Sequence, residues 1–203
     1  MNSQQVEAIF RESGALLEGH FLLSSGRHSG QYVEKFRILE QPRLASSLCA
    51  ELADRFRERD IQCVIGPVTG GIILAFEVAR QLGCRAVFAE RGDDGSGFAL
   101  RRGFQIASGE RVLVVEDIVT TGGSALKVID LVRAAGADVI GLGLLCDRSD
   151  GEISWGVPVV ESLMHLSIAS YAPDEVPAEL TAKYGAAVKP GTTAKPGARR
   201  KTA

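Results

Sequence analysis

Short apolar runs alternate with amphipathic segments between residues 62 and 148, and this alternation limits the possible folds more than any other feature of the chain. Three of the apolar runs are predicted to be buried strands, at residues 63–65, 111–115 and 139–145. Residues 85–89 are also predicted to form a strand, and a short strand is expected at 98–101. Two segments have helical spacing and are each followed by a glycine, residues 71–82 and 122–135. Strands and helices that alternate in this way form βαβ units, so the predicted fold class is α/β with a parallel sheet.

The segments on either side of this alternation are predicted to be additions to the core. Helices are expected over residues 4–17 and 42–59, and two short strand-like runs flank residues 24–27. We expect a single domain over residues 1–185, with a core at about 41–150 and additions from about 1–40 and 155–185. Residues 186–203 are rich in Pro, Gly, Lys and Arg and are expected to be a basic, disordered tail.

The composition argues against several classes of protein. A net charge of −2 and the lack of a helix-turn-helix pattern argue against nucleic acid as a partner. The four cysteines have neither C-x-x-C nor zinc spacing, which favours buried free thiols in a reducing compartment. The N-terminus lacks the apolar core of a secretory signal, and no apolar stretch is long enough to span a bilayer. We therefore expect no membrane partner and a cytoplasmic location.

Residues 112–124, with the sequence VLVVEDIVTTGGS, contain the most informative motif. Four apolar residues predict a strand, and Glu116 and Asp117 follow at its carboxyl end, where open α/β sheets bind ligands. These carboxylates can accept hydrogen bonds from vicinal ribose hydroxyls or from Mg²⁺-bound water. The next loop offers backbone N–H groups and hydroxyls at a helix N-terminus, which suits a phosphate, and consists of Thr120, Thr121, Gly122, Gly123 and Ser124. A phosphate site beside a diol site predicts a 5-phosphoribosyl ligand.

Other interpretations of this region are weaker. A solvated acidic turn before a capped helix would explain the Glu-Asp pair alone, but it does not explain the whole motif. Residues 66–71 have the glycine spacing of a Walker A loop, yet Ile72 and Ile73 stand where that motif needs a lysine and a hydroxyl. No G-x-G-x-x-G sequence follows a predicted strand and opens a helix.

The motif VLVVEDIVTTGGS resembles the phosphoribosyl pyrophosphate (PRPP) motif of type I phosphoribosyltransferases. Three more segments resemble parts of orotate phosphoribosyltransferases, and they occur in the family's order. Residues 21–32 (FLLSSGRHSGQY) resemble the N-terminal substrate segment, and residues 65–72 (IGPVTGGI) resemble the pyrophosphate loop. Residues 145–148 (LCDR) resemble a strand end that bears an orotate-contacting arginine. The resemblance covers roughly residues 15–150. It implies the type I phosphoribosyltransferase fold, a central, mostly parallel sheet flanked by helices, with the N-terminal and C-terminal additions forming a small hood.

The resemblance also implies a role for each matching residue. Glu116 and Asp117 would hold the ribose hydroxyls, and residues 120–124 the 5′-phosphate, with Thr120 also beside the base. Arg148 would pair with the orotate carboxylate through its planar fork, although a surface ion pair is the alternative for an arginine at a strand end. The orotate site would also include Ser24, and the pyrophosphate loop Gly70.

Arg91 matches the arginine at the base of the family's mobile loop and would reach pyrophosphate in the neighbouring subunit. This implies a homodimer with shared active sites. The candidates for catalytic residues are Asp117, Arg91 and Arg102.

The chain departs from the family's usual pattern of positive charge. Ser24 and Gly70 stand where lysines are common, and residues 92–97 of the mobile loop contain no cation. Basic residues nearby could compensate: Lys35, Arg37, Arg101 and Arg102. The pattern resembles a divergent orotate subfamily from thermophilic and other bacteria, which ends in a segment like residues 187–191.

The expected reaction converts orotate and PRPP to orotidine 5′-monophosphate and pyrophosphate, on the route to UMP. Mg²⁺ would be the cofactor, held mainly through PRPP and not by a definite set of protein ligands. A purine-base phosphoribosyltransferase is the alternative within the family, and Arg148 discriminates because a purine has no carboxylate to pair with it. A non-catalytic, PRPP-binding regulator is the alternative outside enzymes, because the mobile loop lacks lysines.

Overall fold

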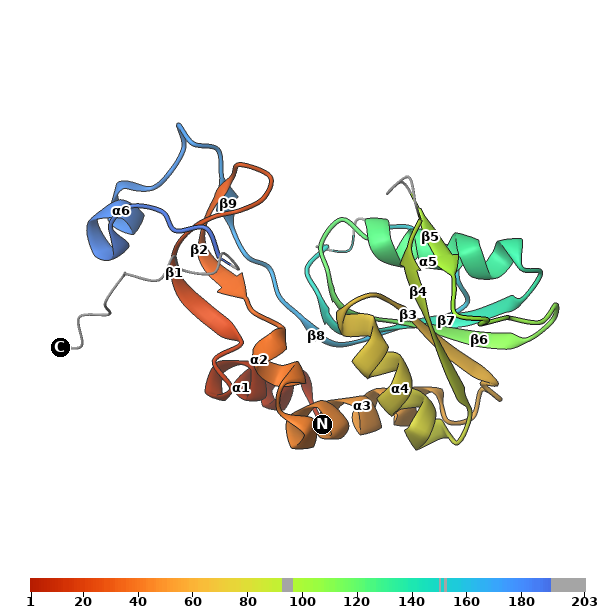
Figure 1. Ribbon diagram of the computed structural model, residues 1–203. Coiled ribbons are helices and arrows are strands. Elements are labelled where there is room, and N and C mark those ends of the chain that lie inside the picture. Colours follow the sequence, from red (N-terminus) through yellow and green to blue (C-terminus); the bar gives the residue numbers. More distant parts are fainter. Residues whose placement is uncertain (93–96, 150, 152, 191–203) are drawn as a thin grey trace. The chain divides into compact units, whose positions relative to one another are not determined.

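The computed structural model describes residues 1–92, 97–149, 151 and 153–190, which form two compact units (Figure 1). The larger unit consists of Met1–Ala15 and Lys35–Ser167. The smaller unit consists of Leu16–Glu34 and residues 168–190. The expectation of one domain with a hood at about 1–40 and 155–185 stays a prediction.

The larger unit is built on a six-stranded sheet in the order β5-β4-β3-β6-β7-β8. Its strands are β3 (Cys63–Pro67), β4 (Arg85–Arg91), β5 (Phe98–Leu100), β6 (Arg111–Val119), β7 (Asp138–Asp147) and β8 (Val160–His165). All neighbouring strands pair in parallel except β4 and β5, which are antiparallel. This confirms the predicted α/β fold with a mostly parallel sheet. The strand β8 was not predicted, because it lies at the sheet edge and only two of its residues are buried.

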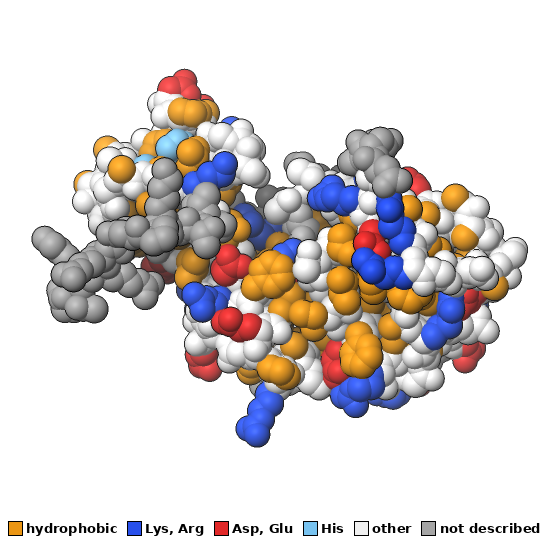
Figure 2. Space-filling view, in the orientation of Figure 1, with side chains coloured by type: hydrophobic (Ala, Val, Ile, Leu, Met, Phe, Trp, Pro, Cys, Tyr) orange, Lys and Arg blue, Asp and Glu red, His pale blue; other side chains and the backbone are white. Residues whose placement is uncertain are grey.

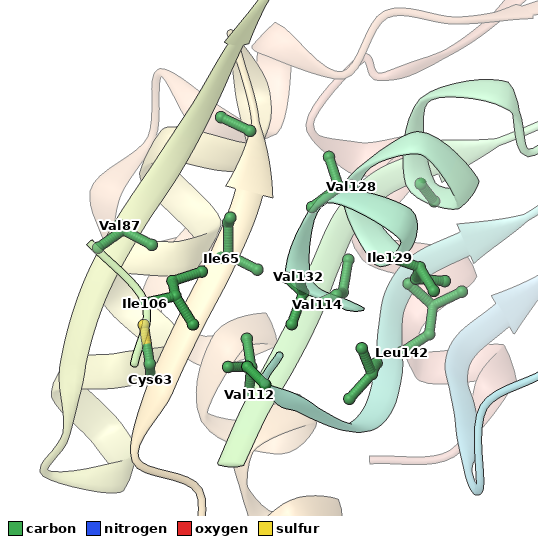
Figure 3. Close-up of a cluster of buried hydrophobic side chains, with 14 of the residues drawn as sticks. Cys63, Ile65, Val87, Ile106, Val112, Val114, Val128, Ile129, Val132 and Leu142 are labelled. Carbon is green, nitrogen blue, oxygen red and sulfur yellow. The ribbon is translucent and has the colours of Figure 1, made fainter. Parts of the chain in front are cut away.

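Helices cover both faces of this sheet, as Figure 1 shows. Helix α5 (Gly123–Ala134) packs on one face, and its buried side chains meet alternate residues of the strands in a single hydrophobic cluster (Figure 3). Along β6, Val112 and Val114 belong to this cluster, as the period of a strand requires. Helices α3 (Pro42–Phe56) and α4 (Gly70–Leu82) pack on the opposite face.

Two glycines of β7 allow α3 to approach the sheet closely. A Cβ at Gly141 would lie 2.7 Å from the Phe56 ring, and one at Gly143 would lie 3.1 Å from the Leu52 side chain. These distances are too short for a larger residue without displacement of α3. The G-L-G sequence inside a predicted strand therefore has a packing function.

The first helix is shorter than predicted. Helix α1 (Ser3–Glu12) begins with a capping box between Asn2 and Gln5, and it ends before Gly14, which has a φ of 72°. The expectation of a helix to residue 17 was wrong, because this left-handed glycine ends the helical path and the chain continues as a strand.

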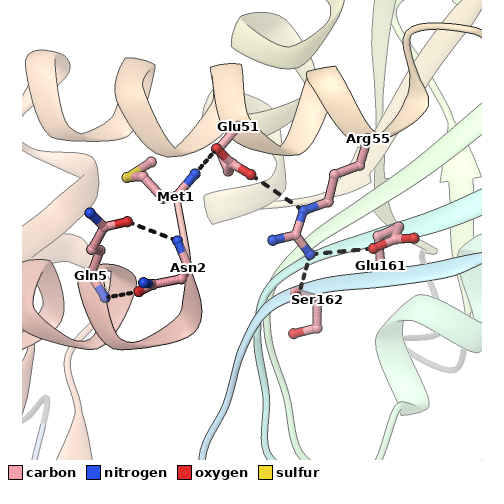
Figure 4. Close-up of polar contacts among 7 residues, drawn as sticks. All are labelled: Met1, Asn2, Gln5, Glu51, Arg55, Glu161 and Ser162. Carbon is pink, nitrogen blue, oxygen red and sulfur yellow. Dashed lines mark hydrogen bonds and ion pairs between the residues drawn. The ribbon is translucent and has the colours of Figure 1, made fainter.

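Polar contacts hold α1 and β8 to α3 (Figure 4). The N-terminal amino group pairs with Glu51 on α3. Arg55, one turn along the same helix, lies 3.6 Å from Glu51, pairs with Glu161 at 3.3 Å, and donates a hydrogen bond of 2.9 Å to the backbone oxygen of Ser162. These contacts link the start of the chain to the edge of the sheet.

The smaller unit has its own three-stranded antiparallel sheet, in the order β1-β2-β9. Its elements are β1 (Leu16–Leu22), β2 (His28–Val33), β9 (Ser170–Tyr171) and α6 (Ala178–Tyr184). The two strand-like runs around residues 24–27 are thus confirmed as β1 and β2. In the larger unit the short helix α2 (Phe36–Leu39) precedes α3. Among the helices described, none has both the length and the apolar character needed to cross a bilayer.

Candidate active site

The carboxylates of the motif lie inside the end of β6, since this strand continues to Val119. Glu116 is 7% exposed and Asp117 only 1%. The backbone N–H of Ile118 donates to Asp117 Oδ1 at 2.7 Å, and the N–H of Asp117 donates to Glu116 Oε1 at 3.2 Å. The main chain of β6 therefore holds both side chains at the carboxyl edge of the sheet, where ligands bind in open α/β folds.

The loop that follows forms a pocket with Glu116 at one side. The pocket has a volume of about 80 Å³ and is lined by Glu116 and residues 118–125. Gly122, with a φ of 73°, turns the chain into α5, and no side chain of the described residues caps this helix. The exposed Thr120 and Thr121 precede it. The first N–H groups of α5 and its dipole therefore favour an anion in this pocket.

Lys35 neutralises the buried aspartate. Its Nζ lies 2.9 Å from Asp117 Oδ1 and 2.8 Å from Oδ2. Burial and the charge of Asp117 raise the pKa of Glu116 to about 8, and the positive charge of Lys35 opposes this rise. The site thus holds two buried carboxyl groups and one partly exposed ammonium group.

A glycine at the start of α4 makes room for this aspartate. A Cβ on Gly70 would lie 1.8 Å from Asp117 Oδ2, well inside contact distance. Before it, Gly66 and Gly71 bring β3 and α4 together, since a Cβ on either would lie within 2.8 Å of the other's backbone. The N-terminus of α4 therefore lies directly beside the acidic pair.

Arg148 follows β7 beside the end of β6. Its backbone N–H donates to the oxygen of Val119 at 2.8 Å, and its side chain is half-buried. Before it, Asp147 is 7% exposed and accepts a hydrogen bond of 2.8 Å from the N–H of Ser149. Arg148 thus begins at the same edge of the sheet as the acidic pair and the loop before α5.

The other basic candidates lie toward the β4–β5 end of the strand order. Arg91 ends β4, with its guanidinium 5.6 Å from the centre of the Phe98 ring. Arg102, after β5, pairs with Glu90 at 2.7 Å and is largely exposed. Figure 2 shows Lys and Arg side chains gathered in this region. Of the mobile loop expected at residues 92–97, residues 93–96 lie outside the described part of the chain.

The larger unit therefore brings together most, but not all, of the predicted site residues. These are Glu116, Asp117, Gly70, Arg148 and residues 120–124, whereas Arg91 and Arg102 lie on the β4–β5 edge and Ser24 belongs to the smaller unit. The pairing of Lys35 with Asp117 was missed, because the sequence marked Lys35 only as one of several nearby cations.

The acidic pair fits a divalent cation whose other ligands come from a substrate. Mg²⁺ prefers oxygen ligands and is commonly held by one or two carboxylates together with phosphate oxygens. Within the described residues, no cluster of three or more His, Cys, Asp or Glu side chains could hold a metal ion. Glu116 and Asp117 can then supply acceptors for the cation or its waters, but not a complete cage.

Comparison with known proteins identifies the family of the chain. The phosphoribosyl transferase domain matches residues 37–174. The orotate phosphoribosyltransferase of Caldanaerobacter subterraneus subsp. tengcongensis is 50% identical over 95% of this chain and 98% of its own length. That of Pelotomaculum thermopropionicum is 49% identical over 95% of this chain and 98% of its own length. The crystal structure of orotate phosphoribosyltransferase from Aeropyrum pernix has a TM-score of 0.67 and 30% identity, covering 79% of this chain and 93% of that one.

The chain belongs to the phosphoribosyltransferase family. Its identity to these relatives, over nearly the whole length of each, places it in the orotate phosphoribosyltransferase branch of that family. The resemblance found in the sequence is thereby confirmed.

Proposed function

We propose that the protein transfers the phosphoribosyl group of PRPP to orotate, giving orotidine 5′-monophosphate and pyrophosphate for UMP synthesis. The observation that carries this proposal is the buried acidic pair at the end of β6, directly before the uncapped N-terminus of α5. A sugar needs hydrogen-bond acceptors and its phosphate needs donors, and this strand and helix supply both within one pocket.

The main task of the protein is to orient the two substrates. Residues 120–124 would hold the 5′-phosphate through backbone N–H groups and hydroxyls, while Glu116 and Asp117 accept hydrogen bonds from the ribose hydroxyls. Negative charge near the ribose also stabilises the positive charge that develops as pyrophosphate leaves C1. Bound Mg²⁺ supplies positive charge that neutralises the diphosphate.

Turnover with a panel of bases tests this proposal. The purified protein is given PRPP, Mg²⁺ and either orotate, adenine, guanine or hypoxanthine, and release of pyrophosphate is measured. We expect pyrophosphate to be released when the base is orotate and not when it is one of the three purines. Release with a purine and not with orotate would favour the purine-base alternative. PRPP binding by calorimetry, without release for any base, would favour a non-catalytic regulator.

Arg148→Ala tests the recognition of the base. A guanidinium paired with a carboxylate contributes more than a neutral hydrogen bond, so we expect the KM for orotate to rise roughly 10–100-fold. The KM for PRPP should change little, because Arg148 directly follows β7 and is not part of the phosphate loop. Arg148→Lys keeps the charge but loses the fork, and it should recover only part of the loss. An unchanged KM for orotate would remove Arg148 from the base site.

We further propose a homodimer in which Arg91 acts in the partner's active site. Three apolar side chains of α2 and α4 are unusually exposed for a monomer: Phe36 at 43%, Ile73 at 39% and Phe76 at 65%. Hydrophobic side chains gather on this face in Figure 2. Burial of such side chains against a second copy would offset their exposure to water.

A further inference from the structure

Asp117 is the most deeply buried charged side chain of the candidate site, and Lys35 reaches it from a different part of the chain. The Asp117 side chain is 2% exposed, whereas that of Lys35 is 34% exposed. A buried carboxylate without a partner would lose its charge or move into solvent. Lys35, just before α2, gives this carboxylate a positively charged partner inside the larger unit.

The two oxygens of Asp117 have different partners. Oδ1 accepts aligned hydrogen bonds from Lys35 and from the N–H of Ile118. Oδ2 is close to Lys35 in distance, but among the described residues it receives no hydrogen bond with good geometry. This oxygen faces Gly70, where a Cβ would come within 1.8 Å. Asp117 thus has one buried acceptor without an aligned hydrogen bond, and Lys35 and the first turn of α4 lie on either side of it.

We infer that Lys35 is a positioning residue for PRPP, and this rests on the proposed function. While the site is empty, Lys35 fixes Asp117 in the orientation that accepts a ribose hydroxyl. When PRPP binds, the hydroxyl satisfies the carboxylate, and the partly exposed ammonium moves toward the diphosphate beside the N-terminus of α4. The flexible four-carbon stem of lysine permits this movement.

A purely structural ion pair would behave differently. Its loss would lower the stability of the larger unit and affect both substrates alike. A positioning residue has a selective effect, because only PRPP carries the ribose and the diphosphate. Measurement of the KM for PRPP, the KM for orotate and the melting temperature therefore distinguishes a positioning role from a purely structural one.

Lys35→Met keeps the apolar stem and removes the charge, and the complete protein is assayed with orotate, PRPP and Mg²⁺. We expect the KM for PRPP to rise at least about tenfold, while the KM for orotate stays within about twofold. Lys35→Arg should restore part of the affinity for PRPP. Arg57→Met is the matched control, since it also removes a cation paired with an aspartate, Asp54, but at the surface end of α3.

A second variant probes Asp117 without altering Lys35. Gly70→Ala adds a methyl group that would displace the Asp117 carboxylate from the side opposite Lys35. This variant should raise the KM for PRPP although Lys35 is still present.

The outcomes distinguish this inference from the proposed function. If the unaltered protein does not use orotate and PRPP, the proposed function fails first. If it does, and Lys35→Met matches Arg57→Met in both KM values, the inference is overturned. It is also overturned if Lys35→Met raises both KM values equally together with a lower melting temperature.

Discussion

Glu116 and Asp117 are neighbours in the chain but differ in how their burial is compensated. Asp117 has an ammonium group within 3 Å, whereas Glu116 has mainly the backbone N–H of Asp117 and the negative charge beside it. Burial and this negative charge raise the pKa of Glu116 to about 8. In the free protein at neutral pH, Glu116 therefore holds a proton, and it can donate one hydrogen bond as well as accept.

This shift predicts how Glu116 contributes to stability. The folded protein keeps the proton until about pH 8, whereas the unfolded chain releases it at the usual pKa of a glutamate, near 4.5. Between pH 4.5 and about 8 the folded state binds more protons than the unfolded state. The contribution is therefore complete below pH 4.5, falls across this range and is lost as the pH rises through 8. Glu116→Gln cannot ionise, so its free energy of unfolding should lack this decline.

Urea unfolding of both proteins between pH 5 and pH 8 measures the difference. Over this range the free energy of unfolding of the original protein should fall by at least about 1 kcal/mol relative to Glu116→Gln, the equivalent of one pKa unit. The thiols of Cys49 and Cys146 do not interfere, since burial raises the pKa of each to about 12. Parallel pH curves for the two proteins would show that Glu116 ionises normally.

At this scale, the sequence predicted what is local and missed what is distant. The acidic pair and residues 120–124 are contiguous, so their position after a strand follows from the strand and helix pattern alone. The pairing of Lys35 with Asp117 joins residues 82 positions apart. The need for glycine at position 70 likewise depends on where α4 meets the end of β6. Both are properties of the packed structure, and neither has a signature in the local sequence.

Among the elements, the glycine after α4 marked the end of that helix correctly, whereas the end of α1 at Gly14 was missed. Gly83 has a φ of 73° and ends α4 at Leu82, as expected. The central strands were also predicted, because continuous apolar runs are typical of a parallel sheet buried on both faces. Helix α6 and strand β9 were not predicted: α6 has no buried residue and β9 has only two residues. Short elements at a surface have too little apolar pattern to identify them.

Two left-handed glycines offer a matched pair of element-scale variants. Gly122 and Gly83 share a φ of 73°, so alanine at either position costs about 1–2 kcal/mol of backbone strain. A Cβ at Gly83 meets nothing within 4 Å, whereas at Gly122 it would lie 2.8 Å from Ile153 and 2.9 Å from Trp155. Gly122→Ala should therefore lower the free energy of unfolding by more than Gly83→Ala.

The same pair should separate stability from function. Gly122→Ala should displace the loop that lines the pocket before α5, so the KM for PRPP should rise. In Gly83→Ala the KM for PRPP should stay unchanged, because Gly83 lies at the end of α4. Urea unfolding and steady-state kinetics of both variants check this. Equal kinetics in the two variants would mean that the turn at Gly122 does not bind PRPP.

At the scale of the whole molecule, the sheet places its basic and acidic candidates on different strands. Arg91 is on β4, separated from β6 by β3, and it contacts the Phe98 ring of the edge strand β5. Such a residue at the margin of the sheet is well placed to serve a second copy of the chain. The exposed apolar side chains of α2 and α4 supply the surface that such a pair would bury.

Mixing two inactive variants tests the shared site. Arg91→Ala and Asp117→Asn should each abolish turnover in a homodimer, because every site then lacks one residue. After subunit exchange at equal concentrations, about half of the dimers are mixed. In each mixed dimer, one of the two sites has both residues intact. About a quarter of all sites are therefore intact, so about a quarter of the normal activity should return. If Arg91 served its own subunit, every site would still lack one residue and the mixture would stay inactive. Phe76→Asp, placed in both variants, is the control: it puts a charge on the exposed apolar face of α4, and it should prevent the recovery and give a monomer by light scattering.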